Sequence, residues 1–323
     1  MRNFITVLMT TYNCGEYISQ AIKSVLNQTY KDFELLIIDD GSTDNTQEIV
    51  KRFMDERIRF IQSKHIGRSS ALNLGLKEAS NDLISFCDAD DIIHPKKIEN
   101  QIILHKNRND LIFTDLAYFQ GKEILYTIKS PKELTDIKKK IALHGHLNFS
   151  VMFDRIFIIN FGGYDSQKIE FVDYDLWLRI INGSNIIITN EILYFQRLRE
   201  NSLSTTKTMK KKNLIYKLQK PYFEKLEEHF GITSSKEQLI IKGWREFFYG
   251  SKNLARKYWI DAGISQWNIK LFITSLLSYL PESFLDYLKD KRIRLRLEYQ
   301  IQKLLNNNDI QKEFNKVMEI MGE

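Results

Sequence analysis

DFELLIIDDGSTDNT, at residues 32–46, is the stretch from which we predict the fold. Its apolar run from Phe33 to Ile38 has the length of a buried strand, and the turn-forming residues Asp39-Asp40-Gly41-Ser42 close it. Capping side chains between Ser42 and Asp44 predict the start of a helix. A buried strand that runs directly into a helix is the repeating unit of a parallel sheet covered by helices.

The same alternation continues on both sides of this stretch. Further strands are expected at Phe4 to Met9, Ile58 to Ile61 and Leu83 to Cys87, with helices from Ile18 and from Ser69. The predicted fold class is therefore α/β, a Rossmann-like, mostly parallel sheet flanked by helices. In such sheets, ligands bind beyond the carboxyl ends of the strands, where the loops gather.

The rest of the chain mixes strands and helices and then becomes helical. We expect a hairpin around Gly121, separate short strands at 186–188 and 192–195, and a helix from Asp173. Beyond residue 205 the strand patterns fade, and Lys, Glu and Leu recur at helical spacing. The sequence thus predicts an α/β domain at residues 1–204 and an α-helical C-terminal domain at residues 205–323.

Composition narrows the class of protein. The chain has 323 residues, of which 43% are hydrophobic, so it can bury a sizeable core. Cys14 and Cys87 make no disulfide framework, which predicts a reducing compartment. Residues 1–13 lack the pattern of a signal peptide, and the apolar stretch from Leu271 to Leu280 is far shorter than the roughly 20 residues that span a bilayer. We therefore expect a cytoplasmic protein.

Three carboxylates lie within four residues, directly after an expected strand, in Asp88-Ala89-Asp90-Asp91. Without partners, such a cluster repels itself and resists desolvation. A hard divalent cation, Mn²⁺ or Mg²⁺, relieves this repulsion, and Mg²⁺ typically keeps one or two carboxylates plus substrate phosphates as ligands. Such a cation also stabilises the charge on a departing diphosphate. The alternative is a capped loop at a strand end, because Asp-x-Asp alone is common.

Three further polar clusters lie at ends of the expected strands and helices. The acidic residues from Asp39 to Asp44 could accept a hydrogen bond from a base or a ribose, or could serve only as turn and cap. Tyr12 could stack on a base, or could belong to an ordinary turn. Arg68 enters a helix and could pair with a phosphate, or could lie at the surface.

Taken in order, these clusters form a pattern that resembles the inverting family 2 glycosyltransferases, which have the GT-A fold. The matching stretches are VLMTTYN at 7–13, DFELLIIDDGSTDNT at 32–46, GRSSALNLGL at 67–76, SFCDADD at 85–91 and FVDYDLWLR at 171–179. The order and spacing match over roughly the first 200 residues, and the resemblance does not extend past about residue 205. It implies transfer of a sugar from a nucleotide-diphosphate donor, most often a UDP-sugar, to a hydroxyl of a glycan or lipid-linked acceptor. It also makes residues 1–204 the catalytic domain and leaves 205–323 for acceptor, membrane or oligomer contacts.

The resemblance implies a role for individual donor-site positions. The positions matched in this way are Thr10, Tyr12 and Asp40 for the nucleoside, Arg68 for the donor, Asp88 near the ribose and Asp90 for the metal, Mn²⁺ or Mg²⁺. Asp173 matches the acid that acts as general base.

The chemistry of the reaction and the helix geometry around Asp173 are compatible with that role. Inverting transfer needs a base that takes the acceptor's proton as its oxygen attacks, on the side of the sugar away from the leaving diphosphate. Asp173 and Asp175 stand at the expected start of a helix, and two acids two residues apart do not share a helix face. One can therefore point into the cleft while the other caps the helix. Without the resemblance, capping by both acids is an equal alternative.

Two positions depart from the family pattern. Val172 stands where the family usually has Glu, which alters how the neighbouring base is tuned. Arg199 stands where a His is expected, and arginine cannot be a metal ligand. We therefore predict no His ligand, and Arg199 becomes a candidate contact for the diphosphate or an ordinary surface residue.

The C-terminal part of the chain is basic and aromatic. From residue 205 onward, Lys and Arg outnumber Asp and Glu by 22 to 14. Such helices suit peripheral contact with the inner face of the cell membrane, near a lipid-linked acceptor, or form an ordinary solvated surface. No nucleic-acid-binding motif accompanies the charge, so nucleic acid is not an expected partner. The sequence makes no prediction of the oligomeric state.

Two other functions fit parts of the pattern. A nucleotidyltransferase shares the sheet and the acidic loop, but it usually has a Gly-rich loop with a Lys after the first strand, which TTYNCGEY at 10–17 lacks. A catalytically inactive nucleotide-sugar-binding scaffold would not need the acids retained at positions 88, 90 and 173. Glycosyl transfer is therefore the preferred prediction.

Overall fold

The computed structural model describes residues 4–130, 137, 150–168, 171–199, 209–263 and 308–322. The chain divides into two compact units. The first contains Met1–Lys132, Leu147–Leu198 and Leu305–Glu323, and the second contains Glu133–His146 and Arg199–Leu304. The domain division expected at residue 205 stays a prediction. The first compact unit differs from it by including the last helix of the chain.

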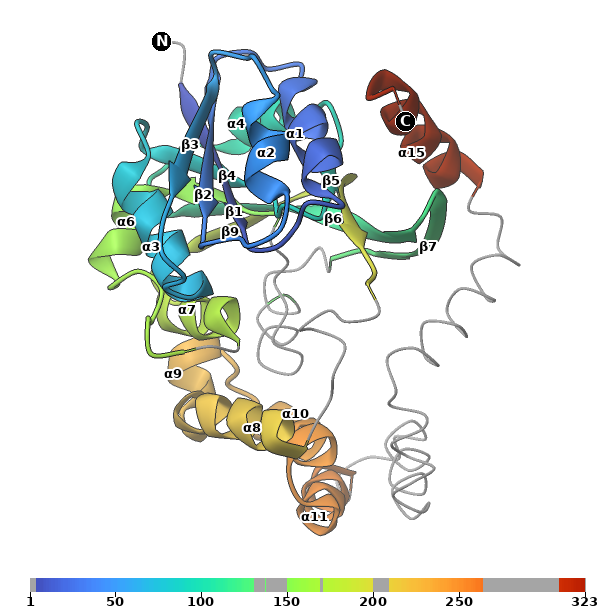
Figure 1. Cartoon of the computed structure of the whole chain (residues 1–323). Coiled ribbons are helices and arrows are strands. Elements are labelled where there is room, and N and C mark those ends of the chain that lie inside the picture. Colours follow the sequence, from blue (N-terminus) through green and yellow to red (C-terminus); the bar gives the residue numbers. More distant parts are fainter. Residues whose placement is uncertain are drawn as a thin grey trace. The chain divides into compact units, whose positions relative to one another are not determined.

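The first unit is built around one sheet (Figure 1). Its elements in chain order are β1 (Ile5–Thr11), α1 (Ile18–Leu26), β2 (Phe33–Asp39), α2 (Thr46–Lys51), β3 (Ile58–Gln62), α3 (Arg68–Glu78), β4 (Leu83–Phe86), β5 (Ile92–Ile93), α4 (Lys97–Leu104), β6 (Asp110–Gln120), β7 (Glu123–Ile128), β8 (Met152–Asp154), α6 (Arg155–Asn160), α7 (Val172–Ile180), β9 (Asn185–Arg197) and α15 (Asn308–Ile320). The strand order is β3-β2-β1-β4-β8-β6-β9-β5, and β7 pairs with β6. β1 to β4 run parallel, as do β6 and β9, whereas β5, β7 and β8 join antiparallel. The predicted α/β sheet flanked by helices is confirmed.

The centre of the sheet positions the site because helix α3 packs tightly onto it. Val7 of β1 lies opposite Leu35 of β2, and both side chains are fully buried, as expected for parallel strands covered on both faces. α3 crosses these strands at Gly75, where a Cβ atom would lie 2.4 Å from Leu8 Cδ1. This close approach fixes the start of α3, with Arg68, at the carboxyl edge of the sheet.

Two element boundaries differ from the sequence-based expectation. The two short strands expected at 186–188 and 192–195 are one strand, β9, which accommodates shifts in its pairing with β6 and a left-handed Asn190 with φ of 58°. Helix α2 begins at Thr46, after the expected capping residues. The Asp44 carboxylate accepts hydrogen bonds from the Gly15 and Thr46 amides at 2.9 and 3.0 Å, so it joins two loops. The hairpin around Gly121 is confirmed.

The described part of the second unit is helical. Its elements are α8 (Met209–Glu224), α9 (Leu226–Phe230), α10 (Ser235–Tyr249) and α11 (Lys252–Gly263). α10 packs on α11 around the buried Trp259, and Gly243 makes room for its indole. None of the helices over the described residues combines the length and apolar character needed to cross a membrane. The basic run at 291–296 lies outside the described residues.

Candidate active site

The acidic loop between β4 and β5 brings three carboxylates together. Asp88, Asp90 and Asp91 each have a carboxylate oxygen within 4.8 Å of those of the other two. Asp88 and Asp90 are partly exposed, whereas Asp91 is 2% exposed. Oxygen donors at this spacing suit a hard divalent cation. The loop follows β4, so it lies at the carboxyl edge of the sheet, as the sequence predicted.

Asp91 is the buried anchor of this loop. Its carboxylate accepts hydrogen bonds from the Tyr194 hydroxyl at 2.9 Å and from the Arg197 amide at 2.8 Å. Burial, together with the charges of Asp90 and Asp88, raises the pKa of Asp91 well above its ordinary value. Because both oxygens are engaged by β9, the more exposed Asp88 and Asp90 are better placed to meet a ligand.

Arg68 supplies a positive charge beside the loop. Its guanidinium donates to the Asp88 carboxylate at 3.2 Å. Burial opposes the charge, but Asp88, Asp173 and Asp90 outweigh it and hold the pKa of Arg68 above its ordinary value. The structure thus brings Arg68 and the acidic loop together, as expected of a donor site that handles phosphates.

Asp173 lies in the first turn of α7, partly buried, and close enough to feel the charges of Arg68 and Asp88. Among the described residues, its Oδ1 atom is buried and has no hydrogen-bond partner. Burial raises the pKa of Asp173 to about 7, although Arg68 counteracts it. Phe171 precedes the helix at φ of 58°, a left-handed conformation that costs about 1–3 kcal/mol. A carboxylate held without a partner near neutral pKa is suited to accept a proton.

Asp175 has a different environment from Asp173, two residues away. Its carboxylate pairs with Lys168 and with Arg179, the latter at 2.9 Å. Arg179 also donates to the carbonyl oxygens of Phe161 and Gly163 at 2.6 Å. Asp175 therefore stabilises the loop before α7. The sequence predicted that one of these two acids caps the helix; Asp175 instead forms ion pairs, and the role of Asp173 as base stays a prediction.

The predicted nucleoside residues gather at the ends of β1 and β2. Tyr12 stacks on His65 with ring centroids 4.3 Å apart and planes 24° apart, and both side chains are substantially exposed. Asp40 is buried, and its carboxylate accepts hydrogen bonds from the amides of Ile66 at 2.7 Å and Gly67 at 3.1 Å. Asp40 thus holds the loop that carries His65 and leads into Arg68.

The remaining predicted donor-site residues are Thr10 and Arg199. Thr10, on β1, is partly buried opposite Ile38 of β2. Arg199 falls in the second compact unit, so its contact with a diphosphate stays a prediction.

Four residues around the site escaped the sequence analysis. These are His65, Tyr164, Tyr194 and Arg197, to which the sequence assigned no role in the site: Tyr194 was expected only as part of a strand, and the folded chain brings all four to the site. The Tyr164 hydroxyl is buried without a hydrogen-bond partner among the described residues, and burial together with the Asp173 charge raises its pKa well above the ordinary value. The Tyr194 hydroxyl accepts from the Asp88 amide at 3.1 Å.

Comparison with known proteins identifies the family of the chain. The sequence model of the family described as Glycosyl transferase family 2 matches residues 6–164. Over 207 residues, the chain is 34% identical to the UDP-Glc:alpha-D-GlcNAc-diphosphoundecaprenol beta-1,3-glucosyltransferase WfgD of Escherichia coli, a match that covers 63% of this chain and 80% of that protein. The chain belongs to glycosyl transferase family 2. It spans 66% of the length of an uncharacterised glycosyltransferase of Rickettsia typhi, to which it is 30% identical.

Solved structures of glycosyltransferases share the fold. TarS 1–349 of S. aureus in complex with UDP-GlcNAc has a TM-score of 0.60 and 17% identity, over 81% of this chain and 79% of that one. The mannosyltransferase PcManGT of Pyrobaculum calidifontis, in complex with GDP-Man and Mn²⁺, has a TM-score of 0.58 and 15% identity, over 95% and 89%. The glycosyltransferase therefore has the GT-A fold, and the family and enzyme class predicted from the sequence are confirmed.

Proposed function

We propose that this glycosyltransferase moves a sugar, with inversion and with the help of a divalent cation, from a UDP-sugar to a hydroxyl of a glycan or lipid-linked acceptor. The observation that carries the proposal is the combination of an acidic loop, tied to Arg68, with Asp173, whose pKa is raised and whose buried Oδ1 has no hydrogen-bond partner in the described part of the chain. The first is suited to a nucleoside diphosphate, and the second to an acceptor hydroxyl.

The relatives support the choice of donor and acceptor class. WfgD is named for UDP-Glc and for a diphosphoundecaprenol-linked GlcNAc, and TarS is seen with UDP-GlcNAc. PcManGT holds GDP-Man on the same fold, so the nucleotide has to be tested directly. A lipid-linked acceptor would bring the enzyme to the membrane surface. Cytoplasmic localisation and peripheral membrane contact stay predictions.

The acidic loop fits a divalent cation. Asp90 is the proposed ligand, and Asp88 lies within reach while it accepts from Arg68. Mn²⁺ or Mg²⁺ bound there would counter the negative charge that develops on the diphosphate as it leaves. Arg68, held protonated by its acidic neighbours, would bind the same phosphates through charge-assisted hydrogen bonds.

Asp173 would act on the acceptor. The acceptor oxygen forms a bond to the anomeric carbon while the bond from that carbon to the diphosphate oxygen breaks on the opposite side. The acceptor's proton passes to the Asp173 carboxylate, and the electron pair of the broken bond leaves with the diphosphate. Within the described ranges, Asp173 has no ion-pair partner, in contrast to Asp175, so its carboxylate is available for this proton.

Calorimetric titration with nucleoside diphosphates tests the donor site. We expect wild-type protein to bind UDP in the presence of Mn²⁺, and Asp90→Ala to lose that metal-dependent binding. Asp55→Ala is the matched control, because Asp55 pairs with Arg57 away from the acidic loop and should leave binding unchanged. Failure of the wild type to bind any nucleoside diphosphate would contradict the donor assignment and favour an inactive scaffold.

His65 is expected to contribute to nucleobase binding. Its imidazole stacks on Tyr12 and contacts Asp40 through Nδ1 at 3.1 Å, so it extends the aromatic surface next to the donor loop. Removing one aromatic partner costs about 0.5–1.5 kcal/mol, so His65→Ala should weaken UDP binding roughly twofold to tenfold. His65→Phe, which keeps the stacking, should bind nearly as well as wild type. Equal affinities of all three proteins would place the nucleobase elsewhere.

A further inference from the structure

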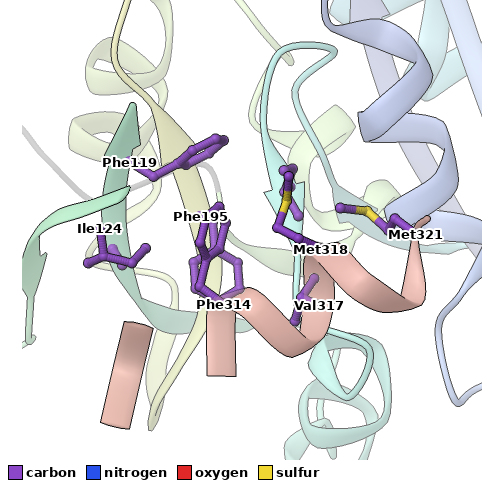
Figure 2. Close-up of a cluster of buried hydrophobic side chains, with 9 residues drawn as sticks. Phe119, Ile124, Phe195, Phe314, Val317, Met318 and Met321 are labelled. Atoms are coloured by element: carbon purple, nitrogen blue, oxygen red, sulfur yellow. The ribbon is translucent and has the colours of Figure 1, made fainter. Parts of the chain in front are cut away.

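Helix α15 belongs to the first compact unit, which carries the candidate active site. α15 packs in a cluster of apolar side chains from the edge of the sheet that carries β5, β6, β7 and β9 (Figure 2). The buried members are Ile92, Ala117, Phe119, Ile124, Phe195, Phe314, Val317, Met318 and Met321. Phe314 lies at the centre, with its ring centroid 4.9 Å from those of both Phe119 and Phe195. Burial of this apolar face accounts for the docking of the helix.

Polar contacts fix the position of α15 along the sheet. The Gln311 side chain accepts from the Ile124 amide at 2.7 Å and donates to the Lys122 carbonyl at 3.0 Å, so it binds the end of the β6–β7 hairpin. Glu313 lies 3.9 Å from Nε2 of His94, which follows β5. These contacts fix the position of α15 along the sheet edge, and in this position Phe314 packs against Phe119 and Phe195.

The ring of Phe119 connects α15 to the acidic loop. The Arg197 guanidinium carbon lies 4.4 Å from the centroid of Phe119 and 4.8 Å from that of Tyr17. Arg197 Nε donates to the Asp90 carbonyl oxygen at 2.8 Å, and its amide donates to Asp91 at 2.8 Å. The residue that holds the backbone of Asp90 therefore rests on the ring that Phe314 supports.

We propose that α15 positions the acidic loop, through Phe314, Phe119 and Arg197, for binding of the cation and the donor diphosphate. The inference rests on the proposed function of that loop. Three neighbouring carboxylates repel one another. The Arg197 guanidinium offsets part of this repulsion. The two hydrogen bonds of Arg197, to the Asp90 carbonyl and the Asp91 carboxylate, hold the loop in place before a metal binds. The contact with the Asp90 carbonyl depends on the Arg197 guanidinium. This guanidinium packs against the rings of Tyr17 and Phe119 and donates to the Gln20 side chain at 2.6 Å. α15 covers the ring of Phe119.

Substitutions on α15 test this coupling, with Mn²⁺-dependent UDP binding and thermal unfolding as the two measurements. Phe314→Ala should weaken Mn²⁺-dependent UDP binding by about threefold to thirtyfold at a temperature where the protein is folded. Ile320→Ala is the matched control, because Ile320 is on the same helix and exposed. It should bind like wild type. Phe314→Leu keeps an apolar side chain without a flat ring and serves if Phe314→Ala does not fold; it should also bind more weakly than wild type.

A double-mutant cycle separates positioning from stability. If α15 acts through Arg197, then Phe314→Ala should weaken binding much less in an Arg197→Met background than in wild type. A Phe314 variant that unfolds at lower temperature but binds Mn²⁺ and UDP with wild-type affinity would overturn the proposal, as would full additivity in the cycle. Failure of the wild type to bind UDP is a different result, since it would contradict the proposed function and not the coupling.

Discussion

Asp173→Asn should lower the rate of sugar transfer by about 10²- to 10⁴-fold, the usual contribution of a positioned general base. Asparagine has nearly the same shape but cannot take the acceptor's proton. Asp173 is not the proposed metal ligand, so Mn²⁺-dependent UDP binding should be retained. Single-turnover rates with a UDP-sugar, together with calorimetry on the same variant, measure the two effects separately.

Asp175→Asn is the informative control for this variant. Asp175 pairs with Lys168 and Arg179, which hold the loop before α7, so its loss should lower the unfolding temperature. Its effect on the chemical step should be much smaller than that of Asp173→Asn. An Asp173→Asn enzyme with near wild-type turnover would show that another group removes the proton.

The pH dependence follows from the same residue. Only the carboxylate form of Asp173 can accept a proton, and burial raises its pKa to about 7. We therefore expect kcat/KM to fall about tenfold per pH unit below this pKa, because protonation removes the base. The residual activity of Asp173→Asn should lack this limb. A wild-type limb near pH 4 would contradict the assignment of a buried base.

Local patterns in the sequence were sufficient to predict the strand-end clusters and that Asp173 and Asp175 have different surroundings. Each of these features depends on residues close together in the chain: an apolar run followed by acids, or two acids on different faces of one helix turn. The ion pairs of Asp175 with Lys168 and Arg179 were not predicted, and the role of Asp173 as base stays a prediction. The start of α2 was misplaced because Asp44 has the chemistry of a cap, yet it bonds to Gly15 in another loop.

The contacts that hold the acidic loop and α15 in place could not be predicted, because they join segments that are far apart in the sequence. Arg197 meets Asp90 across 107 positions of the chain, and Gln311 meets Ile124 across 187. An arginine on a strand and an amphipathic C-terminal helix have many possible partners, and only the tertiary fold selects among them. Phe314, the aromatic residue of α15, looks like an ordinary core position in the sequence, which it also is.

Addition of saturating Mn²⁺ should raise the unfolding temperature by about 5–10 °C, the shift expected when a ligand is present at about 100 times its Kd and stabilises a domain of this size by roughly 2.7 kcal/mol. The reason is the mutual repulsion of the carboxylates in the acidic loop. Burial and the neighbouring charges raise the pKa of Asp91 well above its unfolded-state value, and burial raises that of Asp173 as well. Groups with raised pKa values stabilise the folded state at low pH and lose that contribution as pH rises through the folded pKa. Without metal, stability should therefore fall between about pH 4 and pH 8.

A bound cation should reverse this trend, because it stabilises the ionised carboxylates. The increase caused by Mn²⁺ should be larger at pH 8 than at pH 5, where protons compete for the same oxygens. Asp90→Asn removes one negative charge from the cluster, so the metal-free variant should unfold at a higher temperature than wild type and respond little to Mn²⁺. The same Mn²⁺ increment in wild type and in Asp90→Asn would place the cation outside the acidic loop. If the predicted pattern is found, repulsion within the acidic loop destabilises the metal-free protein, and the contacts of Arg197 with Asp90 and Asp91 offset part of that repulsion.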